Sequence, residues 1–90
     1  MTQERIAAPM PGVVARILPN EAVLVLPLQG KVEVLNAVGA RIWQLLDGKR
    51  SLREVAAIVS NEYDVSAAQA EQDTEEFLRR LFDLKAIQWK

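Results

Sequence analysis

The sequence predicts one α+β domain of the winged helix-turn-helix type, with a three-stranded antiparallel sheet followed by three helices. Three observations predict this fold. Short runs rich in β-branched residues and separated by turn residues fill the first part of the chain. Capping boxes and helical periodicity follow. The chain of 90 residues is long enough for a single hydrophobic core.

The first part of the chain predicts three strands, at residues 13–18, 22–26 and 31–35. Proline, asparagine and glycine residues between these runs are typical of turns. In the third run polar and apolar residues alternate, and a period of two places Val32 and Val34 on the buried face. Residues 1–12 contain two prolines and a glycine, so we interpret them as a flexible arm that precedes a folded domain at 13–90.

The second part of the chain predicts three helices, at about 37–46, 52–63 and 67–84. Asn36 is a favourable N-cap, and Ser51 and Ser66 each open a capping box. The apolar period of the third helix predicts a buried stripe formed by Ala70, Thr74, Phe77, Leu78 and Leu81. The β-prone residues after it favour a short terminal strand.

The composition argues against most kinds of catalysis. The chain has no histidine and no cysteine, so it lacks the commonest general base, metal ligand and thiol nucleophile. We therefore expect a non-enzyme with no metal and no cofactor. The net charge is −1, and no secretory signal or membrane-spanning run is apparent, so we expect a cytoplasmic protein that binds neither nucleic acid nor membrane.

A DNA-binding winged helix is the alternative that the fold suggests. The recognition helix would be the third one, whose first turns carry Glu71, Asp73, Glu75 and Glu76. These carboxylates would repel DNA phosphates, with only Arg79 and Arg80 to compensate. The helix macrodipole stabilises acidic side chains near a helix N-terminus. This effect explains the acidic group without a catalytic or metal-binding role.

A peptide-binding groove explains the pattern better. The third strand is expected at the edge of the sheet, where an extended peptide can add a further strand. The third helix would form the facing wall. The candidate contact residues are Lys31, Val32, Glu33, Val34 and Leu35 in the strand and Asp73, Glu76, Phe77, Arg80, Leu81 and Leu84 in the helix. Phe82 lies on the flank of the third helix opposite to Arg80 and Leu84, and the sequence does not determine which of the two flanks faces the strand. The same edge can also pair two copies into a homodimer.

Three segments resemble PqqD-like proteins in register. Val34–Gly48 is similar to their "vLN…aaaIWelLDG" segment and Arg50–Ala56 to the start of their next helix, and Glu62–Leu81 is similar to their "eYdv…D…fL..L" ending. One departure is Ala86, which stands where the family usually has a glycine.

The resemblance implies a RiPP recognition element, which binds the leader of a ribosomally made precursor peptide in the cleft between the third strand and the third helix. It also implies a partner enzyme, either a leader peptidase, as in lasso-peptide biosynthesis, or a radical SAM enzyme. Because proline removes a main-chain donor, we expect proline at Glu33 to weaken leader binding.

Overall fold

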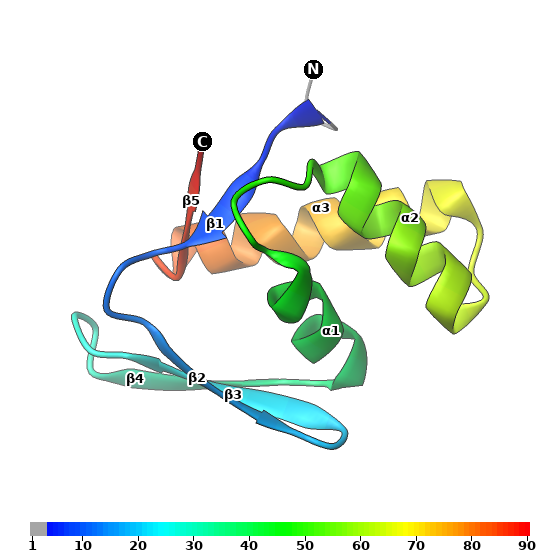
Figure 1. Ribbon diagram of the computed structural model, residues 1–90. Helices are drawn as coiled ribbons and strands as arrows, with labels where there is room; N and C mark the ends of the chain where they lie inside the picture. Colours follow the sequence, from blue (N-terminus) through cyan, green and yellow to red (C-terminus); the bar gives the residue numbers. More distant parts are fainter. Residues whose placement is uncertain (1–3) are drawn as a thin grey trace.

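The computed structural model describes residues 4–90, and Figure 1 shows their arrangement. The elements are β1 (Ala7–Pro9), β2 (Val14–Leu18), β3 (Glu21–Leu26), β4 (Lys31–Leu35), α1 (Ala37–Leu45), α2 (Leu52–Tyr63), α3 (Ala67–Asp83) and β5 (Ile87–Trp89). Strands β2, β3 and β4 form an antiparallel sheet in that order, with the three helices after it. The predicted fold class is confirmed, and β4 lies at a sheet edge.

The predicted burial of β4 is wrong by one residue. Val32 and Val34 are 62% and 58% exposed, and Leu35 is buried. The pairing with β3 explains the difference, because Glu33 lies opposite the fully buried Leu24 and therefore shares its face. The core face of β4 consequently carries Lys31, Glu33 and Leu35, and the two valines lie on the outer face.

The N-terminal segment differs from the flexible arm that the sequence predicted. Residues 1–3 of that arm lie outside the described part of the chain, but Ala7–Pro9 form β1, which pairs antiparallel with β5. Ala7 is 2% exposed and belongs to the core. The turn-forming residues Pro11 and Gly12 come after this strand, so they direct the chain from β1 to β2 without preventing the pairing.

The helices begin where the capping signals placed them. The side chains of Asn36, Ser51 and Ser66 accept hydrogen bonds from the main chain of the first turns of α1, α2 and α3. Glu54 completes a reciprocal capping box at Ser51. Helix α3 ends in a Schellman motif, in which Lys85 adopts a left-handed conformation with φ of 61°.

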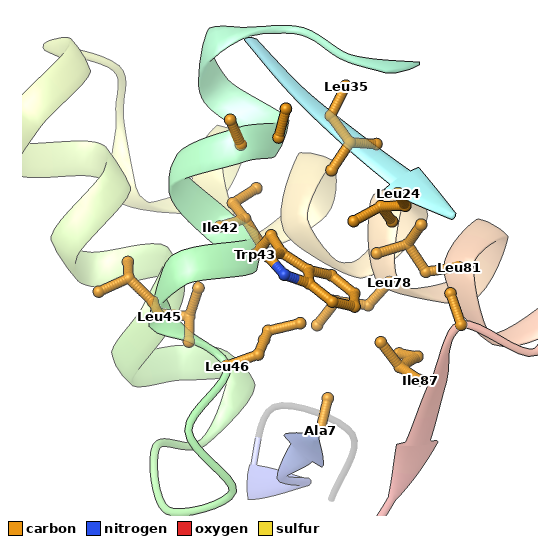
Figure 2. Packing of buried hydrophobic residues seen from close by; sticks show 14 of the residues in the cluster. Ala7, Leu24, Leu35, Ile42, Trp43, Leu45, Leu46, Leu78, Leu81 and Ile87 are labelled. Carbon is orange, nitrogen blue, oxygen red and sulfur yellow. The ribbon is translucent and has the colours of Figure 1, made fainter. Parts of the chain in front are cut away.

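The core lies between the sheet and the helices, with Trp43 of α1 at its centre. In Figure 2 the Trp43 ring points toward Leu24 of the sheet and Leu78 of α3, and Ile87 of β5 lies below it. The predicted stripe of α3 is buried at Ala70, Thr74, Leu78 and Leu81, and Phe77 is only partly buried. One side of α3 therefore fills the core, and the partly exposed flanks are available for other contacts.

Candidate peptide-binding groove

The main-chain groups of Val32 and Val34 point to the open edge of β4. Glu21 closes a two-residue turn between β2 and β3, so its main chain bonds to β2. Main-chain direction alternates along a strand, so Leu24 bonds instead to its partner Glu33 on β4. The intervening valines of β4 therefore offer their N–H and C=O groups to an added strand.

Helix α3 forms the second wall of the groove. Arg80 Nη2 donates to Glu33 Oε1 at 2.5 Å and joins the middle of β4 to α3. This ion pair identifies the flank of α3 that faces the strand, which the sequence left open. The backbone of α3 packs mainly on α2 and also on β5 and makes little or no contact with β4. Figure 1 shows α3 crossing above the sheet, with α1 between them at one end.

The N-terminus of α1 closes one end of the groove. A hollow of about 310 Å³ is lined by Asn36, Val38, Gly39, Ile42, Asp73 and Phe77. A Cβ atom on Gly39 would lie 3.1 Å from two ring carbons of Phe77, so this glycine permits close packing of the ring on α1. The sequence prediction did not include α1 in the site. Gly39 was the signal that could have indicated it, because a glycine in a helix predicts the close packing of another element there.

The structure divides the predicted contact residues into two groups. Leu81 is fully buried and Leu35 is 2% exposed, so their side chains support the groove from the core and cannot line its surface. The other residues of the prediction are exposed or partly exposed, namely Lys31, Val32, Glu33, Val34, Asp73, Glu76, Phe77, Arg80 and Leu84.

The charges of the groove are unevenly distributed along α3. Asp73 accepts a hydrogen bond from Gln69 Nε2 at 2.8 Å, and neither Asp73 nor Glu76 forms an ion pair within residues 4–90. Arg80 is the cation of this wall. The groove is thus acidic toward α1 and basic near the middle of β4.

The opposite flank of α3 carries a separate aromatic cluster. Phe82 is 46% exposed, and its ring centroid lies 6.4 Å from that of Trp89 in β5. The guanidinium of Arg5 lies 4.0 Å from the Trp89 ring centroid, in cation–π geometry. Phe82 therefore does not line the groove beside β4.

Neither a metal site nor a membrane span is found in the described chain. Across residues 4–90, no group of three or more histidine, cysteine, aspartate or glutamate side chains is arranged to hold a metal ion. Over the same range, no helix has the length and apolar character needed to span a bilayer.

The open strand edge beside a helix flank defines a winged-helix domain of the kind that accepts a peptide strand. The profile of the family described as "Coenzyme PQQ synthesis protein D (PqqD)" matches residues 21–87. The chain therefore belongs to the PqqD family, as the resemblance of its motifs suggested.

Solved structures agree with this assignment. TbiB1 in complex with the TbiA(beta) leader peptide is 31% identical, with a TM-score of 0.83 over 90% of this chain and 94% of that one. The PqqD part of PqqCD from Methylobacterium extorquens, described as a stand-alone RiPP recognition element, is 24% identical, with a TM-score of 0.77 over 92% and 88%.

A lasso peptide synthetase B1 complexed with the leader peptide is also 24% identical, with a TM-score of 0.81 over 91% of this chain and 96% of that one. At that identity the last two show the shared fold. No curated protein matches the sequence significantly.

Proposed function

We propose that this domain binds the leader segment of a ribosomally made precursor peptide as an added strand on β4, in the groove between β4 and α3. The observation that carries the proposal is the open β4 edge beside the flank of α3 that carries Arg80, whose ion pair with Glu33 marks this flank as the one facing the strand. Main-chain bonds to Val32 and Val34 would supply affinity, and the side chains of α3 would supply selectivity.

Similarity to TbiB1 supports this proposal, because that protein was solved with a leader peptide bound. The domain itself is proposed to be non-catalytic and to need no cofactor. It would bring the precursor to a modifying enzyme, either a leader peptidase or a radical SAM enzyme, and raise the local concentration of substrate there.

DNA binding is not favoured. Helix α3 would have to enter the major groove with its N-terminal half, and Glu71, Asp73, Glu75 and Glu76 occupy the second and third turns of that half. Bringing four carboxylates to DNA phosphates is electrostatically unfavourable. In the proposed groove, by contrast, Asp73 and Glu76 face a peptide that can carry complementary charges.

A titration of the full chain with the leader of a precursor encoded beside it tests the proposal. We expect a dissociation constant in the micromolar range or below. The substitution Val34→Pro should weaken binding at least tenfold, because it removes an N–H from the open edge without breaking a bond between β3 and β4. This position is more selective than Glu33, where proline would also disrupt the sheet itself.

Val34→Thr is the matched control, since it keeps the N–H and the β-branched shape and should bind the leader as the natural chain does. Thermal unfolding of both variants checks that the sheet is intact. Equal leader binding by the Val34→Pro and Val34→Thr variants, or binding of duplex DNA in place of the leader, would refute strand addition at β4.

A further inference from the structure

Arg80 holds Glu33 with only part of its guanidinium. The ion pair between Arg41 of α1 and Glu62 of α2 offers a comparison. Arg41 binds Glu62 through both Nε and Nη2, at 2.8 and 2.9 Å. Arg80 uses Nη2 alone, and its side chain is 55% exposed. Its Nε and Nη1 therefore have no partner within residues 4–90, and they can donate to a carboxylate from a ligand.

Glu33 lies at the centre of β4 and points into the groove, where its side chain is 24% exposed. If a peptide strand pairs antiparallel with β4 through Val32 and Val34, its residue opposite Glu33 forms a non-hydrogen-bonded pair, in which side chains approach most closely. The side chain of that peptide residue also points into the groove and lies next to Arg80. The chemistry of this one peptide position is therefore set by Arg80 and Glu33.

The next inward-facing position of the peptide meets a charge of opposite sign. Glu76 and Arg80 are four residues apart on α3, which corresponds to a rise of about 6 Å. Alternate residues of a strand are spaced about 6.7 Å apart on one face, so the two spacings match. Helix α3 runs antiparallel to β4, because Arg80 binds Glu33 in the strand, whereas Asp73, nearer the start of the helix, lines the same hollow as Asn36, which follows the strand. Glu76 therefore faces the peptide two residues from Arg80, on the side toward α1.

Resting on the proposed function, we infer that the groove selects a peptide in which an acidic and a basic side chain stand two residues apart, the acid bound by Arg80 and the base by Glu76. The acid completes the partly used guanidinium, which then lies between two carboxylates. The base neutralises a carboxylate that has no cation partner in the described chain. For an antiparallel peptide the order from the N-terminus is base, any residue, acid.

A charge-swap experiment tests this inference with the full chain. A display library of random dodecapeptides is selected against the natural domain and against the double variant Glu76→Arg with Arg80→Glu, which keeps the net charge. We expect the natural domain to enrich peptides with one order of the two charges and the variant to enrich the reverse order. In a peptide selected by the natural domain, replacing the acid by its amide should weaken binding about tenfold.

Helix α3 supplies a matched control. Glu75 and Arg79 have the same charges and spacing and form an ion pair at 3.1 Å, but they lie on the other flank, toward Phe82. The double variant Glu75→Arg with Arg79→Glu should select the same peptides as the natural domain. Thermal unfolding shows that each variant is folded.

The outcomes separate this inference from the proposed function. If the variant at Glu76 and Arg80 enriches the same peptides as the natural domain, and Val34→Pro still weakens their binding, the charge rule is wrong and strand addition stands. If the control swap reverses the preference as well, the readout reflects general electrostatics and the rule is also wrong. If the natural domain enriches no peptide and binds no leader, both fail.

Discussion

Asp47 stabilises the turn after α1 through its side chain. Its Oδ1 accepts hydrogen bonds from the main-chain N–H groups of Lys49 at 2.9 Å and Arg50 at 3.0 Å. These bonds, the one from Lys49 most strongly, lower the pKa of the Asp47 carboxyl below its ordinary value, and the nearby Arg50 guanidinium adds to the effect. Because the folded-state pKa is the lower one, the stabilisation is complete above the unfolded-state pKa and disappears as the pH falls through the folded-state value.

The substitution Asp47→Asn should therefore reduce stability at neutral pH, since asparagine carries no charge to strengthen these bonds. The difference between the two proteins should shrink as the pH is lowered through the acid range. Urea unfolding at a series of pH values measures this difference. A difference that stays constant into strong acid would mean that the charge of Asp47 does not contribute.

Lys85 has a backbone conformation that favours glycine. It is the left-handed residue of the Schellman motif, with its N–H bonded to the carbonyl of Phe82 and that of Ala86 bonded to the carbonyl of Leu81, both at 2.9 Å. The left-handed position at the end of α3 is thus Lys85, one residue before the alanine that replaces the glycine of the family pattern.

The substitution Lys85→Gly should raise the free energy of unfolding by about 1 kcal/mol, because a residue with a Cβ is disfavoured by about 1–2 kcal/mol in this conformation and glycine recovers part of that. Chemical denaturation gives the value. Lys49→Gly, at an exposed position without positive φ, is the control and should give no gain. A loss of stability in the Lys85 variant would contradict the assignment of this cap.

At the scale of elements, β1 contributes more to the stability of the fold than its length of three residues suggests. Its neighbours extend the pairing with β5, because Lys90 N–H donates to Ile6 at 2.7 Å and Met10 N–H donates to Ala86 at 2.9 Å. Without β1, the buried Ile87 would lose its strand partner Pro9, and the core would lose the buried side chain of Ala7.

A chain that begins at Met10 should therefore lose on the order of 2–4 kcal/mol of stability, from several main-chain hydrogen bonds and the exposure of apolar surface. Urea unfolding of the shortened and full chains measures the loss. If residues 1–9 were only a flexible arm, the shortened and full chains would unfold at the same urea concentration. The experiment therefore distinguishes a flexible arm from a paired strand.

The elements that the sequence predicted well are those with local signals. Each helix start had a capping side chain next to it, and each strand of the main sheet had turn residues beside it, so their bounds agree closely. The pairing of β1 had no local signal, and the alternation along β4 pointed to the wrong face. Alternation along β4 allows two phases, and the choice between them depends on Leu24 in another strand.

At the scale of the whole molecule, the groove combines two regions that are distant in the sequence, namely β4 with the adjoining N-terminus of α1, and α3. The sequence supplied both of its main walls, β4 and α3, and most of their exposed residues. It could not identify the flank of α3 that faces the strand, because a helix with charged residues on both flanks can turn either way. In the structure, the Glu33–Arg80 ion pair shows which flank of α3 faces β4. The packing of α3 on α2 and β5 sets that orientation.

The pairing of β1 with β5 also affects the order in which this domain can be completed during synthesis. The two strands lie at opposite ends of the described chain, so their pairing closes the longest loop and must wait until Ile87 has left the ribosome. Until then Ala7 and the neighbouring core residues lack part of their cover. The nascent chain therefore keeps apolar surface accessible to chaperones until β5 emerges.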